Sequence, residues 1–250
     1  GLVYTFTLKN NLVFHDDTPL SSADILFTIN KIKDGESNSP HKVNWDGVSV
    51  EAPDEKTVVF TLKQPYASFL ENATIGIMPQ YLWNSSPLEL NSINTNPIGS
   101  GPYMINKISK KSSGIIDSYE LEPFEKFALG EPYIKNLKLK FYQNENDLIK
   151  MLRDKKVEQI GPINPLNTEV LKDGGFQIES SVLPRVFGLF FNQNQNQLFI
   201  DKTIVKAIDQ AIDKNKIIRE VLLGYGVAIN SPIPPTMSDY QKLSAVDRVA

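Results

Sequence analysis

The chain has 250 residues, 41% of them hydrophobic and 22% charged, which is a globular composition with room for one large or two ordinary domains. Its net charge of −3 argues against nucleic acid or an anionic membrane as the main partner. Because there is no cysteine, disulfides, thiol nucleophiles and cysteine metal sites are excluded.

An alternating pattern opens the chain and predicts a half-buried strand over residues 3–8, with Tyr4, Phe6 and Leu8 on one face. A mature protein rarely begins within a strand, so we expect further residues upstream of Gly1. The sequence shows no secretory signal at its start and no apolar run long enough to span a membrane.

A capped helix and a hairpin follow. Ser21 is a good N-cap and Asp24 stands where a capping box needs an acid. Isoleucines then recur at helical spacing up to Asp34. Residues 48–52 and 57–62 predict a hairpin whose inward face carries Val58, Phe60 and Leu62.

Glycines and prolines concentrate in residues 96–102, which we call the glycine bend. Pro97 and Pro102 each fix φ and remove a donor, while Gly99 and Gly101 allow positive φ and place no side chain beside a neighbour. An ordinary loop, a crossing between two lobes, or a wall where a ligand touches main chain would all suit this composition. The polar stretch before it, residues 84–97, predicts an exposed connector.

The remaining elements predict an α/β architecture with at least two lobes. Asn144 caps one helix, two apolar-striped helices follow near residues 204–212 and 217–222, and Gly224 closes the second. Residues 231–235 predict a stiff extended linker. Strands are expected near residues 103–109, 118–122, 135–142, 157–160, 176–182 and 186–192.

No residue constellation supports catalysis. His15, Asp16 and Asp17 suggest a metal site or an acid–base pair, but adjacent residues of an extended chain point to opposite sides, so we favour a polar turn. His41 lies in a polar loop. Phosphate-binding glycine loops and a Gly-x-Ser-x-Gly elbow are absent from the sequence. We therefore expect neither an enzyme nor a bound cofactor or metal.

Two segments carry groups suited to binding without reaction. One is the glycine bend, and the other is the aromatic and polar stretch of residues 185–192, whose phenylalanines also suit a plain core. The candidate ligand-binding residues are Asn96, Ile98, Gly99, Ser100, Arg185, Phe187, Phe190 and Asn192.

Taken in order, these motifs resemble the extracellular solute-binding proteins of family 5, the peptide- and nickel-binding components of ABC importers. The resemblance covers about residues 3–235. It rests on the strand at 4–8, on His15-Asp16-Asp17-Thr18-Pro19 before the capped helix, on Gly99-Ser100-Gly101-Pro102-Tyr103, on Ala211-Ile212-Asp213-Lys214 and on Ile233-Pro234-Pro235. Asp17 replaces the family's usual glycine, and it can adopt the same left-handed turn at modest cost.

The resemblance implies a two-lobed fold of the type II periplasmic-binding-protein class, truncated here at both ends, that closes on its ligand by a hinge. Residues 1–95 would form a small lobe, residues 96–192 a segment of the main lobe ending in a hinge crossing at 186–192, and residues 193–250 the start of a third domain. The resemblance also implies a monomer that carries peptides or a related solute to an ABC permease. It would act outside the cytoplasm, as a periplasmic protein or a lipoprotein. The alternatives are a ligand-sensing domain of a transcription regulator and a hydrolase. For a hydrolase, the sequence lacks a nucleophile–base set.

Overall fold

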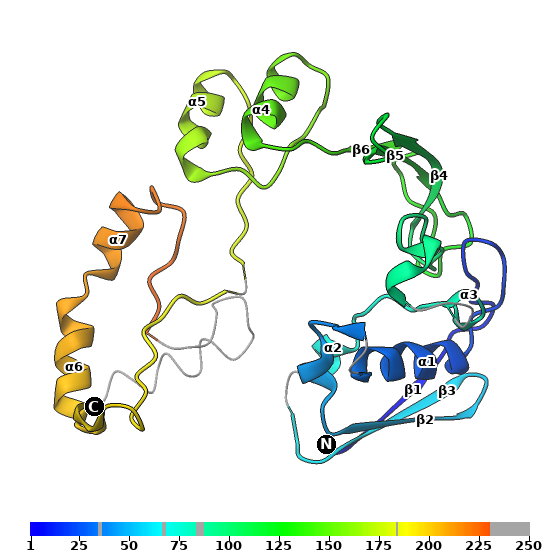
Figure 1. Ribbon diagram of the computed structural model, residues 1–250, viewed down its shortest axis with the longest axis horizontal. Coiled ribbons are helices and arrows are strands. Elements are labelled where there is room, and N and C mark those ends of the chain that lie inside the picture. Colours follow the sequence, from blue (N-terminus) through cyan, green and yellow to red (C-terminus); the bar gives the residue numbers. More distant parts are fainter. Residues whose placement is uncertain (35–36, 67–68, 84–87, 184, 231–250) are drawn as a thin grey trace. The chain divides into compact units, whose positions relative to one another are not determined.

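The computed structural model describes residues 1–34, 37–66, 69–83, 88–183 and 185–230 (Figure 1). The chain divides into two compact units, residues 1–143 and residues 144–250, and each is described here by itself. The lobe boundaries expected after residues 95 and 192 stay predictions. The linker expected at residues 231–235 lies outside the described residues.

An antiparallel three-stranded sheet of order β1-β3-β2 begins the first unit. Its strands are β1 (Val3–Thr7), β2 (Val48–Asp54) and β3 (Thr57–Leu62), and helix α1 (Ser22–Lys33) runs along the sheet (Figure 1). The register sets Tyr4 and Val50 on either side of Phe60. The alternation in the sequence therefore puts one face of each strand toward the core, as predicted.

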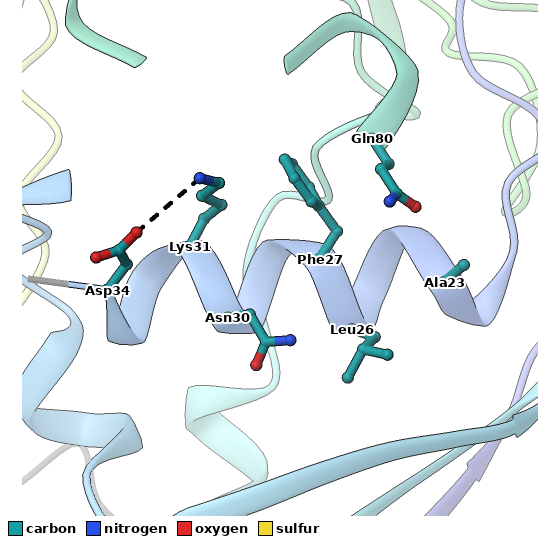
Figure 2. A pocket seen from close by; sticks show the side chains of 7 residues that line it. All are labelled: Ala23, Leu26, Phe27, Asn30, Lys31, Asp34 and Gln80. Carbon is teal, nitrogen blue, oxygen red and sulfur yellow. Dashed lines mark ion pairs between the residues drawn. The ribbon is translucent and has the colours of Figure 1, made fainter. Parts of the chain in front are cut away.

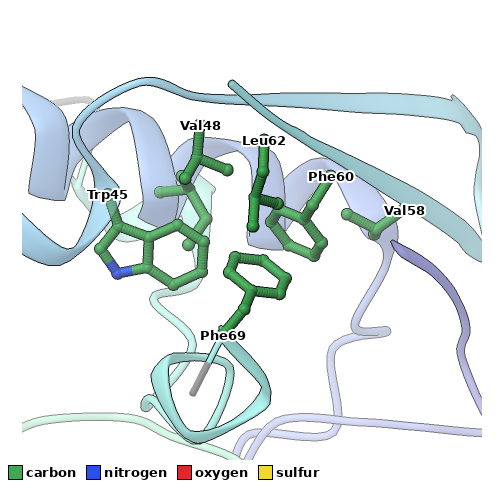
Figure 3. Close-up of a cluster of buried hydrophobic side chains, with 7 residues drawn as sticks. Trp45, Val48, Val58, Phe60, Leu62 and Phe69 are labelled. Carbon is green, nitrogen blue, oxygen red and sulfur yellow. The ribbon is translucent and has the colours of Figure 1, made fainter. Parts of the chain in front are cut away.

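Aromatic side chains fill the space under this sheet (Figure 3). The ring centroids of Trp45 and Phe60 are 5.5 Å apart, and those of Phe60 and Phe69 are also 5.5 Å apart, with tilted or edge-on planes. Tilted and edge-on contacts suit the quadrupoles of aromatic rings and add stability beyond buried area. The predicted inward residues Val58, Phe60 and Leu62 are all buried.

The predicted capping box at the start of α1 is confirmed. The Asp24 carboxylate accepts a hydrogen bond from the Ser21 main-chain N–H at 2.9 Å. Its other oxygen accepts from the main-chain N–H of Gln80 at 3.0 Å, the first residue of the short helix α3 (Gln80–Trp83). Asp24 thus joins the helix start to a segment 56 residues later.

The second sheet of this unit follows the glycine bend directly. It is antiparallel and three-stranded, in the order β4-β5-β6, with β4 (Tyr103–Lys110), β5 (Ile116–Pro123) and β6 (Leu137–Lys140). These strands correspond to the ones expected there, with β6 shorter than predicted. Short turns complete the unit, namely helix α2 (Phe69–Asn72) and 3₁₀ turns at Lys42–Trp45, Leu88–Leu90 and Ser92–Asn94.

The second unit is helical in its described part. Its helices are α4 (Glu145–Arg153), α5 (Thr168–Asp173), α6 (Lys202–Ala211) and α7 (Lys214–Glu220), with 3₁₀ turns at Pro165–Asn167 and Gln197–Ile200. Asn144 caps α4 by accepting from the N–H of Asp147 at 2.9 Å, and Gly224 follows α7 with φ +87°, both as predicted. Within the described chain, no helix is long and apolar enough to cross a membrane.

Strands expected at residues 157–160, 176–182 and 186–192 are not formed, so these predictions are wrong for this structure. The segments have β-branched and aromatic residues with partial alternation, which is the pattern of a strand. A strand, however, exists only where a neighbouring strand takes its main-chain hydrogen bonds. For the described residues from 177 to 191, main-chain hydrogen bonding is limited to a local contact from Arg185 to Leu183.

Candidate functional site

His15 and the glycine bend form the most closely bonded polar cluster that involves a candidate ligand residue. The His15 main-chain N–H donates to the carbonyl oxygen of Gly99 at 2.8 Å. The Gly99 N–H donates to His15 Nδ1 at 3.3 Å, and His15 Nε2 lies 3.0 Å from the carbonyl oxygen of Gly101. These contacts join segments 84 and 86 residues apart in the sequence.

Phe124 supports the same cluster from the end of β5. Its ring meets the His15 ring edge-on, with centroids 5.0 Å apart, and only 4% of its surface is exposed. Its main-chain N–H donates to the carbonyl oxygen of Pro102 at 2.9 Å. The bend is therefore held both in its middle and at its exit into β4.

Neither glycine of the bend adopts the positive φ that glycine allows. Gly99 and Gly101 both lie outside the left-handed region, so their backbone conformation does not require glycine. A Cβ at Gly99 would make an ordinary 3.7 Å contact with His15, and a Cβ at Gly101 would meet nothing within 4 Å. Within the described chain, no neighbour lies close enough to either position to exclude a side chain.

The residues that alternate with these glycines are differently placed. Among the described residues, Ile98 and Ser100 make no main-chain hydrogen bond, whereas Gly99 uses both its N–H and its carbonyl on His15. Both residues are half-exposed. Asn96, before them, is exposed and donates its main-chain N–H to Ile93 at 3.2 Å. The main-chain groups of Ile98 and Ser100 thus have no hydrogen-bond partner within the described chain.

The other candidate residues belong to the second unit. Phe187 is 92% exposed and Phe190 is 88% exposed, which contradicts a core role within the described chain. Arg185 is exposed as well. The Asn192 carbonyl side chain is engaged locally, because it accepts from the main-chain N–H groups of Asn194 and Gln195 at 3.1 and 3.2 Å. Their membership in one ligand site with the bend stays a prediction.

The expected turn at His15, Asp16 and Asp17 is confirmed. Asp17 has φ +68°, which is the left-handed conformation expected where Asp replaces the usual glycine. Its carboxylate pairs with Lys126 at 2.7 Å, with both groups largely exposed. Among the described residues, no group of three or more His, Cys, Asp or Glu side chains is arranged to hold a metal ion.

Asp16 stabilises the turn through its carboxylate. One oxygen accepts from the Thr18 hydroxyl at 2.7 Å, and the other accepts from the Tyr81 hydroxyl. Partial burial tends to raise the pKa of Asp16, but these hydrogen bonds outweigh it and hold the pKa below its ordinary value. The pKa of Tyr81 is raised by burial and by the same hydrogen bond.

Two open hollows lie on the first unit. One of about 480 Å³ adjoins the bend cluster and is lined by His15, Asp17, Met104, Glu122, Pro123, Phe124, Glu125, Lys126, Glu131, Lys135 and Asn136. The other, of about 390 Å³, lies on α1, where Phe27 and Lys31 project from the same side of the helix and Gln80 approaches from α3 (Figure 2). The Lys31 ammonium lies 5.8 Å from the Phe27 ring centroid and 3.9 Å from Asp34.

Sequence reasoning missed the role of His15 in the site. The sequence predicts a turn at His15 and a separate bend at residues 96–102, and it does not predict the contact between them. A signal was available, since both motifs contribute to the resemblance noted above. Nothing in a single sequence shows that two short motifs 84 residues apart lie together.

Comparison with known proteins places the chain. The family model described as bacterial extracellular solute-binding proteins, family 5 Middle, matches residues 1–249. The chain is 28% identical over 258 residues to the oligopeptide-binding protein AppA of Bacillus subtilis, covering 97% of this chain and 45% of AppA. It is 26% identical to a probable D,D-dipeptide-binding periplasmic protein, DdpA, of Escherichia coli, covering 95% of this chain and 46% of DdpA.

Solved structures agree with this placement. The crystal structure of NikZ from Campylobacter jejuni in complex with Ni(L-His) matches with a TM-score of 0.67 and 28% identity, over 93% of this chain and 46% of NikZ. The structure of AppA from Bacillus subtilis with a nonapeptide matches with a TM-score of 0.65 and 25% identity, over 96% of this chain and 48% of AppA. The fold is therefore part of the type II periplasmic-binding-protein class, as expected, and the chain spans about half the length of the relatives it matches.

These relatives are named for the peptides that they bind and not as enzymes, and they give no support to the alternative of a transcription regulator. The family model covers nearly the entire sequence, and the relatives align over almost all of it. The chain belongs to the bacterial extracellular solute-binding proteins of family 5.

Proposed function

We propose that the protein carrying this chain binds a peptide or a related small solute outside the cytoplasm and delivers it to an ABC permease. The family match over residues 1–249 supports this proposal, as do relatives named for oligopeptide and dipeptide binding. Export by a signal upstream of Gly1, as a periplasmic protein or a lipoprotein, and a monomeric state belong to the same proposal.

The observation that carries the proposal is the main chain of the glycine bend. Ile98 and Ser100 make no main-chain hydrogen bonds within the described chain and are half-exposed. An extended peptide presents N–H and C=O groups along its length, and proteins recognise such peptides by adding them to an exposed main-chain edge. Recognition through main chain tolerates many side chains, which suits a carrier of varied peptides.

The candidate side chains of the second unit also carry groups suited to a solute. Arg185 is a fixed positive charge that suits a carboxylate, and its planar guanidinium can bind both carboxylate oxygens. Phe187 and Phe190 offer large exposed apolar surfaces. Asn192 retains its side-chain N–H₂ for donation, because its side-chain oxygen is the atom bonded locally.

Ligand binding would then act through a change of conformation. A solute that contacts both lobes favours the closed form, because the second set of contacts exists only there. The expected lobe boundaries after residues 95 and 192 and the expected hinge at 186–192 belong to this mechanism.

Calorimetry of the full-length protein tests the proposal. Titration with a mixed pool of synthetic peptides is expected to give saturable heat. Nickel with L-histidine and a set of sugars form the other arms of the experiment. Absence of saturable binding to all three would contradict a solute-binding role.

A pair of glycine variants tests the position of the site. A side chain at Gly101 meets nothing within 4 Å and needs no left-handed φ, and the same is true of Gly76. Gly101→Leu and Gly76→Leu are therefore both expected to keep the wild-type melting temperature. Gly101→Leu should lower peptide affinity about tenfold or more, a loss of at least about 1.4 kcal/mol, because it fills space beside the bend. Equal affinity of the two variants would place the ligand elsewhere.

A further inference from the structure

Each ring nitrogen of His15 has a main-chain partner that can act only as a hydrogen-bond donor or only as an acceptor. The N–H of Gly99 can only donate, and it points at Nδ1 from 3.3 Å. The carbonyl of Gly101 can only accept, and it lies 3.0 Å from Nε2. The neutral ring with its proton on Nε2 satisfies both partners, and the other neutral tautomer satisfies neither.

The ring is itself held in place. Phe14, the preceding residue, is fully buried, and its N–H donates to the carbonyl of Thr18 at 2.8 Å across the turn. The His15 main-chain N–H is bonded to Gly99, and the buried Phe124 ring packs edge-on against the imidazole. His15 therefore has its backbone and its ring plane set by the folded chain.

His15 hydrogen-bonds to main-chain groups of Gly99 and Gly101 but not to those of Ser100, which lies between them. It takes the N–H and the carbonyl of Gly99 and the carbonyl of Gly101. Ser100, between the two glycines, keeps its main-chain groups without a partner among the described residues. In a bend fixed at both flanking peptides, the direction in which the Ser100 N–H and carbonyl point is also fixed.

We propose that His15 is a positioning residue of the ligand site: its Nε2–H tautomer clamps the peptide groups of Gly99 and Gly101 and so orients the main chain of Ser100 toward the bound solute. The inference rests on the proposed function for the identity of the solute. A group that is oriented before binding saves the entropy of ordering it in the complex. The chemical class of the recognised partner is a hydrogen-bonding main chain or amide.

The test uses the full-length protein and substitutions that separate the two ring atoms. His15→Phe keeps a ring against Phe124 and removes both nitrogens, whereas His15→Asn keeps an oxygen able to accept from the Gly99 N–H. His41→Phe is the matched control, since His41 lies exposed in another loop. Peptide affinity, melting temperature and the ¹⁵N spectrum of the imidazoles are measured for each protein.

The wild type is expected to show the Nε2–H tautomer at His15. His15→Phe should weaken binding of the peptide pool about tenfold, in line with the loss of two ordinary hydrogen bonds, and His15→Asn should recover part of that loss. His41→Phe should bind as the wild type does. Affinity unchanged in His15→Phe, at any melting temperature, would overturn the proposal, and so would an Nδ1–H tautomer.

Failure of the proposed function gives a different result. The wild type would then bind none of the probes, while the tautomer and the amide shift of Ser100 remain measurable. If the Ser100 amide shift is the same in His15→Phe and in the wild type, His15 does not orient the bend. If the shift moves in His15→Phe and not in His41→Phe, the positioning role stands without a ligand.

Discussion

Individual side chains connect sequence-distant segments of the first unit. Asp24 joins the start of α1 to α3, and His15 joins the turn before α1 to the glycine bend. Asp16 binds the hydroxyls of Thr18 and Tyr81. The bonds to the carboxylates of Asp24 and Asp16 are charge-assisted, and such bonds are stronger than neutral ones.

The hydrogen bond from Tyr81 to Asp16 predicts a pH-dependent effect. Because the pKa of Asp16 is lowered by folding, its contribution to stability is present above its ordinary value of 3.8 and is lost as the pH falls through the folded value. Tyr81→Phe should lower the free energy of unfolding by about 0.5–1.5 kcal/mol at neutral pH. The difference in the free energy of unfolding between Tyr81→Phe and the wild type should shrink as the pH falls below 3.8, the ordinary pKa of Asp16. Urea denaturation at a series of pH values measures this difference.

Tyr133→Phe is the control for this measurement, because the Tyr133 side chain is fully exposed. It should match the wild type at every pH. A Tyr81→Phe deficit that is as large in acid as at neutral pH would show that the lost contact is apolar and does not involve the ionised carboxylate.

Secondary structure in the first unit follows the periodicity of the sequence. The alternating residues of β1 and β3 turn one face to the core, and α1 presents Ile29 to the same core. In α6 the same kind of stripe has no buried residue, although the helix is well capped by Asp201. Periodicity thus predicts which face of a helix is apolar, but it does not predict which element packs against that face.

The aromatic cluster on β3 predicts a large effect of truncation. Phe60 is 4% exposed and touches Trp45, Phe69 and Phe6. Phe60→Ala should lower the free energy of unfolding by about 3–5 kcal/mol, and Phe60→Leu should cost less because it leaves a smaller cavity. Urea denaturation followed by tryptophan fluorescence, to which Trp45 of the cluster contributes, checks this. Phe187→Ala is the matched truncation of an exposed ring and should leave that transition unchanged.

The two compact units differ in how much side-chain surface they bury. The first contains fully buried residues such as Phe14, Val58 and Phe69. In the described part of the second, Leu152 and Leu171 are the buried hydrophobic residues, and α6 and α7 have none. Amphipathic helices this short are marginal in water unless an apolar face is covered.

Hydrogen exchange of the 250-residue chain should reflect this difference. The amides of β3 and α1 are expected to exchange slowly, because opening them exposes the aromatic core. The amides of α6 and α7 should exchange orders of magnitude faster, as measured by mass spectrometry of fragments. Equal protection in both units would show that the helices of the second unit are covered in solution.

Local chemistry was enough to predict several elements of the first unit and two helix caps of the second. The capping box at Ser21 and Asp24, the hairpin of β2 and β3, the left-handed turn at Asp17 and the caps at Asn144 and Gly224 depend on neighbours within a few residues. The order of these motifs along the chain also predicts the family, which the match over residues 1–249 confirms. Such features are local, so the residue types carry the information.

Contacts between segments that are distant in the sequence depend on the tertiary structure. The clamp of His15 on Gly99 and Gly101 depends on a chain path that brings two loops together, and no pattern in either loop encodes the other. Residues 186–192 have the composition of a strand but form none, since a strand is defined by the partner that takes its hydrogen bonds. Burial and strand pairing are properties of the assembled chain, so the sequence of one segment does not determine them.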